Sequence, residues 1–220
     1  MIKAVILDWS GVVSNDWPAT FATSNDVLEE RGHKRLSEEK FRELYELPWM
    51  RFYEKQGIPV NAKDERERWG RLFPKNYGKV KVFPFAKKAI EQLKAKAIKV
   101  IVFSTHNQKL LDKEIENYGL KGLIGFAYGN IDDKRQKIEG LVKAHKIERQ
   151  KTLFVGDMVH DVETARQAGI KSVAVLSGYD SKEKLKKAKP DFLLKDLGKL
   201  PSLVERIKYS GPAGYLEAGK

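Results

Sequence analysis

Residues 4–13 read AVILDWSGVV: four consecutive apolar residues are followed at once by a carboxylate, Asp8. A run that is apolar on every residue is typical of a strand covered on both faces, as in a parallel sheet under helices. A charged side chain that closes such a strand is unusual, which favours a functional role for Asp8 over a role in the following turn. The stretch therefore predicts a buried first strand that ends in a functional site.

Further apolar segments of strand length follow along the chain. They lie at 99–103, 123–128, 152–155, 172–176 and 191–194. Segments with apolar residues at helical spacing fall between most of them, as at 86–97, 134–147 and 200–207. Alternation of this kind implies right-handed crossovers, so the expected fold class is α/β, with a doubly wound parallel sheet.

One interval interrupts the alternation, because residues 16–82 contain no convincing strand. The pattern there predicts helices near 24–32, 37–47 and 63–73, separated by glycines and prolines. We interpret this interval as a small helical domain inserted after the first strand. The predicted organisation is a core of 1–15 and 83–210, an inserted helical domain of 16–82, and a poorly ordered tail of 211–220.

The composition limits the class of protein. With 220 residues, of which 41% are apolar, the chain is long enough to form a globular core. The apolar runs are far shorter than the ~20 residues of a membrane span, and no leader for export is apparent. The chain has 0 cysteines, which excludes disulfides and thiolate metal sites. We therefore expect a cytoplasmic protein without a membrane partner.

The net charge of +12 permits two interpretations. Dense positive charge is one property of nucleic-acid-binding proteins. The basic residues are, however, spread over many segments and interleaved with acidic ones, as on the charged surfaces of heat-adapted cytoplasmic proteins. We favour the second interpretation and expect no nucleic-acid partner, although a positive field would help to attract anionic small molecules. The sequence does not indicate the oligomeric state.

Chemically useful side chains follow the carboxyl ends of the predicted strands. They are Asp8 after 4–7, Ser104 and Thr105 after 99–103, Asp157 and Asp161 after 152–155, and Lys134 at the start of the preceding helix. Ligands of open parallel sheets bind outside the carboxyl ends of the strands. Carboxylates, hydroxyls and an amine at this one edge therefore predict a functional site.

These residues also carry a resemblance to the haloacid dehalogenase-like (HAD) hydrolase superfamily. The first motif of that family, DxDG(T/V), resembles DWSGV at 8–12, and the second, a strand ending in Ser or Thr, resembles VIVFS with Ser104. The third motif is a lysine that opens a helix, for which Lys134 matches best and Lys137 is the alternative. The fourth, GDxxxD, resembles GDMVHD at 156–161. The resemblance implies a Rossmann-like core and makes 16–82 similar to a helical C1-type cap.

The resemblance also implies a metal site and a reaction. The family's phosphatases use Mg²⁺, a hard cation that binds carboxylate and carbonyl oxygens. The implied metal ligands are the side chains of Asp8 and Asp157 and the backbone carbonyl of Ser10, with Asp161 orienting a metal-bound water or Lys134. The implied activity is hydrolysis of a small phosphate ester through an aspartyl phosphate on Asp8.

The implied roles agree with the chemistry of phosphoryl transfer. An aspartate can attack a phosphoryl group only if the repulsion between the two anions is cancelled. Lys134 would hold the phosphoryl oxygens and neutralise charge on Asp8. Ser104 would donate a hydrogen bond to the same group, and Thr105 could share that role.

Ser10 departs from the family pattern. Most phosphatases of the family have a second aspartate at this position, which acts first as general acid and then as general base. Serine donates a hydrogen bond but cannot hold and return a proton near neutral pH. Three interpretations stay open: a phosphatase with weakened or relocated acid–base catalysis, a phosphonatase-like C–P hydrolase using a cap lysine such as Lys55 or Lys34, and a HAD-fold binding or regulatory protein.

Overall fold

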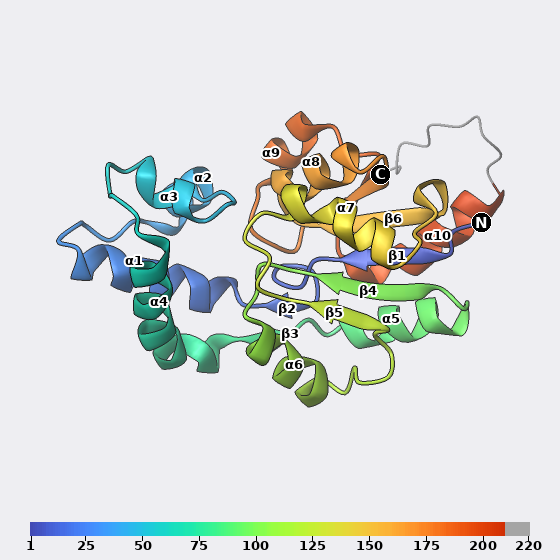
Figure 1. Ribbon diagram of the computed structural model, residues 1–220, viewed down its shortest axis with the longest axis horizontal. Coiled ribbons are helices and arrows are strands. Elements are labelled where there is room, and N and C mark those ends of the chain that lie inside the picture. The colour runs from blue at the N-terminus through green and yellow to red at the C-terminus, as the bar shows by residue number, and fades with distance from the viewer. Residues whose placement is uncertain (210–220) are drawn as a thin grey trace.

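The computed structural model describes residues 1–209, so the predicted tail of 211–220 lies outside the described residues. A six-stranded parallel sheet forms its centre (Figure 1). The strands are β1 (Ala4–Leu7), β4 (Lys99–Phe103), β5 (Phe126–Tyr128), β6 (Thr152–Gly156), β7 (Lys171–Val175) and β8 (Phe192–Leu194). Their order is β5-β4-β1-β6-β7-β8. The predicted α/β class with a doubly wound parallel sheet is confirmed, although β5 is shorter than the predicted 123–128 because 123–125 form a turn.

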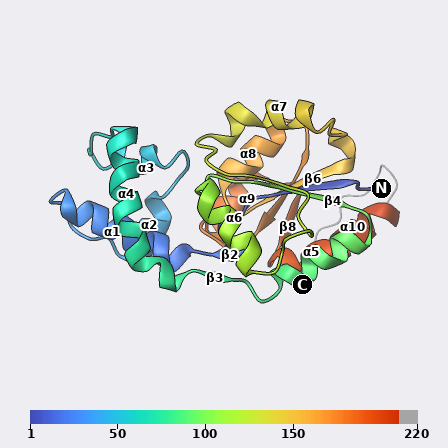
Figure 2. The same cartoon turned by 60° about the horizontal axis from the view of Figure 1, so that its bottom comes forward.

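Helices cover both faces of this sheet. One face carries α5 (Ala86–Ala95), α6 (Gln108–Asn117) and α10 (Leu200–Tyr209), and the other carries α7 (Lys134–Ala144), α8 (Val159–Gln167) and α9 (Lys182–Ala188). Figure 2 shows α7 and α8 on the opposite side of the sheet from α5 and α10. Val5 and Leu7 point into the first layer, whereas Ile6 points into the second. Burial on both faces explains why β1 is apolar on every residue.

Four helices form a separate lobe beside the sheet (Figure 1). They are α1 (Trp17–Glu30), α2 (Glu38–Leu44), α3 (Met50–Glu54) and α4 (Ala62–Asn76). Their apolar side chains form most of one cluster, around Leu28, Phe41 and Phe52. Met158 and Tyr179, from the loops after β6 and β7, pack into the same cluster. The lobe is therefore seated over the carboxyl ends of the strands.

A short ribbon that sequence patterns did not reveal joins the lobe to the sheet. β2 (Ser14–Asn15) pairs in antiparallel fashion with β3 (Lys81–Val82), where the chain enters and leaves the lobe. The prediction that 16–82 has no strand is wrong in this detail, because a two-residue strand is too short to show alternation. Single turns of 3-10 helix complete the chain: η1 (Tyr77–Lys79), η2 (Arg149–Lys151) and η3 (Leu197–Lys199). Within residues 1–209 no helix has both the length and the apolar character needed to cross a membrane.

The division into a core of 1–15 and 83–210 and a helical lobe of 16–82 remains a prediction, which Phe41→Ala tests. Phe41 is fully buried in the lobe cluster, and truncating a buried phenylalanine costs about 3–5 kcal/mol. Hydrogen–deuterium exchange should accelerate in α1, α2 and α4 and stay unchanged in β1, β4 and β6. Ile101→Ala, the matched change within the sheet, should accelerate exchange in the strands. Equal acceleration everywhere in Phe41→Ala would contradict two separately packed units.

Candidate active site

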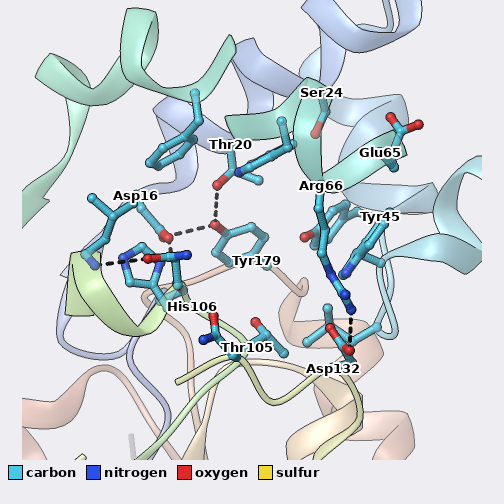
Figure 3. Close-up of a pocket in the computed structure, with 18 of the residues that line it drawn as sticks. Asp16, Thr20, Ser24, Tyr45, Glu65, Arg66, Thr105, His106, Asp132 and Tyr179 are labelled. Atoms are coloured by element: carbon cyan, nitrogen blue, oxygen red, sulfur yellow. Dashed lines mark hydrogen bonds and ion pairs between the residues drawn. The ribbon is translucent and has the colours of Figure 1, made fainter. Parts of the chain in front are cut away.

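The predicted residues meet at one edge of the sheet, beside a cavity. β1 lies between β4 and β6, so Asp8, Ser104 and Asp157 follow three adjacent strands. The direction of winding changes at β1, and crevices at such positions are the usual ligand sites of open α/β sheets. A cavity of about 570 Å³ lies here, lined by Asp8, Thr105 and Asp157 and by side chains of the lobe (Figure 3). This volume is typical of a small-molecule site.

Lys134 joins two of the carboxylates. Its Nζ lies 2.6 Å from Oδ2 of Asp8 and donates to Oδ1 of Asp161 at 2.7 Å. Lys134 is fully buried at the first position of α7, whereas Lys137 is exposed, so the structure brings Lys134 into the site and leaves Lys137 outside it. Burial lowers the pKa of Lys134, but the charges of Asp161 and Asp8 outweigh this and raise it above its usual value. The ammonium therefore stays protonated between the carboxylates.

Burial raises the pKa of Asp8 above its usual value. The charge of Lys134 acts against this rise, the charge of Asp161 adds to it, and the Ser104 hydroxyl lowers it slightly. Ser104 is fully buried, and its Oγ accepts a hydrogen bond from the backbone of His106 at 3.3 Å. The structure thus places the predicted hydroxyl beside the predicted nucleophile.

Asp157 carries an unsatisfied acceptor. Its Oδ2 accepts from the backbone N–H of Tyr179 at 2.7 Å, whereas Oδ1 is buried and has no hydrogen-bond partner among residues 1–209. Burial raises the pKa of Asp157 well above its usual value, and the charges of Asp8 and Asp161 raise it further. A Cβ at Gly178 would come within 1.9 Å of Oδ2, so the backbone packs against this carboxylate as only glycine allows. Because buried acceptors are normally paired, the free oxygen leaves a place that a cation could fill.

The set of oxygens fits a hard divalent cation. Ligand oxygens of Asp8, Asp157 and Asp161 lie within 4.8 Å of one another, and one lysine does not balance three carboxylates. Mg²⁺ binds carboxylate oxygens in such settings. Both oxygens of Asp161 already have partners, since Oδ1 accepts from Lys134 and Oδ2 from the backbone of Met158 at 3.1 Å. Asp8 is paired in the same way, since its Oδ1 accepts from the backbone of Trp9 at 2.6 Å and its Oδ2 lies next to Lys134, so among the three carboxylates only Asp157 offers an unpaired oxygen to a cation.

The hydroxyl of Ser10 meets a carboxylate that sequence reasoning missed. Ser10 Oγ donates to Oδ2 of Asp16 at 2.6 Å, and Asp16 Oδ1 accepts from the hydroxyl of Tyr179 at 2.9 Å (Figure 3). Asp16 is buried and lines the cavity, and burial raises its pKa. Gly11, with φ +72°, turns the chain so that Asp16 returns to Ser10. No periodic pattern links residues 10 and 16, so the sequence carried no signal for this contact.

A second missed feature is the buried pair of His106 and Glu114. His106 Nε2 lies 3.2 Å from Glu114 Oε1, and the same glutamate accepts from Trp9 Nε1 at 2.6 Å. Burial lowers the pKa of His106, but its hydrogen bond to Glu114 and nearby negative charge outweigh this and raise it. Burial raises the pKa of Glu114, but His106 outweighs that effect and the net shift is downward. Both shifts favour an ion pair between His106 and Glu114, next to Trp9 at the end of β1.

Comparison with known proteins identifies the family. The model of a family described as haloacid dehalogenase-like hydrolase matches residues 5–175, a stretch that includes Asp8, Ser10, Ser104, Lys134, Asp157 and Asp161. The chain belongs to this family.

Individual relatives of this HAD-like hydrolase cover almost its whole length. A phosphoglycolate phosphatase of Synechococcus elongatus is 23% identical over 209 residues, which is 94% of this chain and 99% of that protein. The "Putative pyrophosphatase PpaX" of Caldanaerobacter subterraneus is 27% identical over 213 residues, covering 93% of this chain and 95% of that protein. The crystal structure of "a predicted phosphatase from Clostridium acetobutylicum" superimposes with a TM-score of 0.83 at 16% identity, covering 94% and 99% of the two chains. That structural likeness supports the fold.

Asp157→Asn should raise the thermal unfolding midpoint of this hydrolase in EDTA and abolish any further rise caused by Mg²⁺. The change removes one of three buried like charges and, with it, the free acceptor. A gain of 1 kcal/mol corresponds to about 2–4 °C for a chain of this size. Asp180→Asn is the matched control, because Asp180 is also buried but its oxygens are paired with Val159 N at 2.8 Å and Lys184 Nζ at 3.1 Å. The control should lower the midpoint and keep the Mg²⁺ response; the same behaviour in Asp157→Asn would contradict the metal site.

The His106–Glu114 pair should make stability depend on pH. The raised pKa of folded His106 stabilises the protein below about pH 6.5, and this contribution is lost as the pH rises through the folded value. The lowered pKa of Glu114 sets the acid limit, since its contribution is lost as the pH falls through its folded value. Urea unfolding between about pH 5 and pH 9 should show a decline in free energy with rising pH that His106→Gln lacks. Identical pH profiles would refute the ion pair.

Proposed function

We propose that this phosphatase hydrolyses a small phosphate ester with Mg²⁺ as cofactor and Asp8 as nucleophile. The observation that carries the proposal is the setting of Asp8: a buried ammonium lies 2.6 Å from its Oδ2, and a neighbouring Asp157 oxygen has no donor within the described chain. Asp8 and Asp157 both line a cavity of small-molecule size. The names of the relatives, which refer to phosphoglycolate and pyrophosphate, support a small phosphate-bearing substrate.

The residues that would hold Mg²⁺ are Asp8, Asp157 and the backbone carbonyl of Ser10. When bound, the ion supplies positive charge that offsets the carboxylates and the oxygens of the phosphoryl group. Asp161 would act through Lys134, which it holds at 2.7 Å, rather than on the substrate itself. Lys134, together with Ser104 and Thr105, would bind the oxygens of the transferred group.

Asp8 would attack phosphorus with a carboxylate oxygen. The new O–P bond forms as the ester O–P bond breaks, and the leaving alcohol takes up a proton. Water then attacks the aspartyl phosphate, which releases inorganic phosphate and restores the carboxylate of Asp8. The lobe, seated over the strand ends, would keep bulk water out during the first of these steps.

Ser10 limits proton transfer to the leaving group. Its hydroxyl donates to Asp16 at 2.6 Å, and a hydroxyl does not supply protons near neutral pH. General acid catalysis contributes about 10²–10⁴ in rate, so its weakening slows poor leaving groups most. We expect aryl phosphates to turn over faster than unactivated alkyl phosphates.

The proposal also includes a cytoplasmic location and the absence of a nucleic-acid partner. The cysteine-free composition supports the first, and the interleaving of basic and acidic residues along the chain supports the second.

The two alternatives have less support. A phosphonatase-like enzyme needs a lysine in the cavity for an imine with its substrate, and the lining residues within 1–209 include none. Lys55 is half exposed and pairs with Glu46, and Lys34 is exposed. A binding or regulatory role does not explain why a buried ammonium is held against the carboxylate of Asp8.

Asp8→Asn tests the proposal. The wild-type protein should hydrolyse p-nitrophenyl phosphate with Mg²⁺ and lose this activity in EDTA, and Asp8→Asn should lower kcat by about 10³-fold or more. The control is Asp112→Asn, at an exposed carboxylate of α6 that accepts a hydrogen bond from Gln108 at 2.8 Å. The control should retain wild-type activity. Undiminished turnover by Asp8→Asn, or by the wild type in EDTA, would show that the proposed chemistry is wrong.

A further inference from the structure

We propose that a groove at the boundary between the lobe and the α/β core binds a compact polyanion with a chain of phosphate groups, and that this ligand ties the lobe to the core. The groove has a volume of about 840 Å³ and shares Tyr45, Leu47 and Met158 with the wall of the catalytic cavity. Its lining includes none of the residues assigned above to the metal, the nucleophile or the phosphoryl group. The inference therefore does not depend on the proposed function.

Basic side chains outnumber acidic ones around the groove. The basic lining residues are Arg51, Arg135, Arg166, Lys184, Lys187 and Lys189, and the acidic ones are Glu46, Glu163 and Asp180. Each of these carboxylates already has a cationic partner: Glu46 pairs with Lys55 at 2.6 Å, Glu163 with Arg135 at 2.9 Å, and Asp180 with Lys184 at 3.1 Å. The remaining positive charge is therefore not compensated by the groove itself.

The other cations have no carboxylate partner within residues 1–209. Arg51, Lys187 and Lys189 form no side-chain hydrogen bond or ion pair in that part of the chain. Arg166 donates to backbone carbonyls, those of Ala188 at 2.5 Å and Lys189 at 3.3 Å. All four basic side chains are exposed, so a ligand in the groove can reach them. Like charges gathered around one groove repel one another, and a bound anion relieves this repulsion.

These cations come from both sides of the boundary. Arg51 belongs to α3 of the lobe and Lys187 to α9 of the core, and Figure 1 shows the two helices in the upper half of the molecule, one on each side of the boundary. Direct contacts hold the two sides together, since Lys184 Nζ donates to the backbone carbonyls of Arg42 at 2.7 Å and Tyr45 at 3.4 Å. A ligand that binds cations of both sides would stabilise this arrangement further.

The size and donors of the groove favour a compact ligand with several negative charges. A volume of about 840 Å³ is within the range of small-molecule sites, whereas a nucleic acid needs an extended basic surface. Arginine binds two oxygens of a phosphate through parallel hydrogen bonds, and lysine binds phosphate as a point charge. A chain of phosphates places several charges within one small molecule, which matches cations that converge from α3, α8 and α9.

The catalytic cavity is a poor site for such a ligand when Mg²⁺ is absent. Its lining carboxylates are Asp8, Asp16, Glu65, Asp132 and Asp157, and its basic lining residues are Arg66 and His106, which pair with Asp132 and Glu114. A polyanion would meet an excess of negative charge there. Binding measured in EDTA therefore reports on the groove.

Calorimetric titration with inorganic tripolyphosphate in EDTA tests the inference. The wild type should show one site, with a Kd that rises with the salt concentration. The double change Arg51→Gln and Lys187→Gln should raise the Kd by about tenfold or more, because it removes an unpaired cation from each side of the groove. Lys186→Gln is the matched control, since Lys186 is an exposed lysine of the same helix that does not line the groove. The control should keep the Kd within about twofold of the wild type.

Two further measurements address the source of the ligand and the contact with both sides. ATP carries the same chain of phosphates, so binding at least as tight as that of tripolyphosphate would indicate a nucleotide, and weaker binding would indicate free polyphosphate. Hydrogen–deuterium exchange of the wild type with tripolyphosphate should slow in both α3 and α9 and stay unchanged in α5 and α10, on the other face of the sheet.

The outcomes separate a site from general attraction to a basic protein. No binding of tripolyphosphate to the wild type would overturn the inference. Equal weakening by Lys186→Gln and by the double change would also overturn it, because it would show non-specific attraction to a chain of net charge +12. Slower exchange in α9 without slower exchange in α3 would overturn the claim that the ligand ties the lobe to the core.

Discussion

The site depends on one buried interaction, the ammonium of Lys134 held between Asp8 at 2.6 Å and Asp161 at 2.7 Å. Removing these charges from water is costly, and the cost is offset only if β1, α7 and α8 are held in register by the sheet. One cation does not balance the three carboxylates of the cluster. Asp157 is the member of the cluster whose buried Oδ1 lacks a donor among the described residues. In the proposed function, a divalent cation would complete this balance.

The lobe is coupled to the same cluster through Tyr179. The backbone N–H of Tyr179 donates to Asp157 at 2.7 Å, and its hydroxyl donates to Asp16 at 2.9 Å and also lies 2.9 Å from the hydroxyl of Thr20 in α1. Met158, next to Asp157, packs into the apolar cluster of the lobe. Residues that shape the proposed metal site thus also seat the lobe. A change in the charge of the site would therefore alter the contacts that hold the lobe in place.

The sequence revealed those parts of the site that follow from strand patterning. Consecutive apolar residues identify β1 and β6, so Asp8 stands out as the residue that ends a buried strand. The place of Lys134 at the start of a helix suggested it, and the family resemblance favoured it over Lys137, but lysines are abundant in this chain and only burial sets it apart. Asp16 and Glu114 were missed because their partners are brought to them by a turn or from another element. Glu65 lies in a helix rich in charged residues, so the sequence predicts an exposed side chain, although Glu65 is only 2% exposed.

The most direct test of the central claim is a crystal structure with Mg²⁺ and beryllofluoride, a mimic of a carboxylate-bound phosphoryl group. The account predicts beryllium bonded to a carboxylate oxygen of Asp8, with its fluorines near Lys134 and Ser104. It also predicts an ion in contact with Oδ1 of Asp157, the oxygen without a donor in the described chain. Beryllofluoride bound elsewhere, or an ion that does not contact Asp157, would contradict the account.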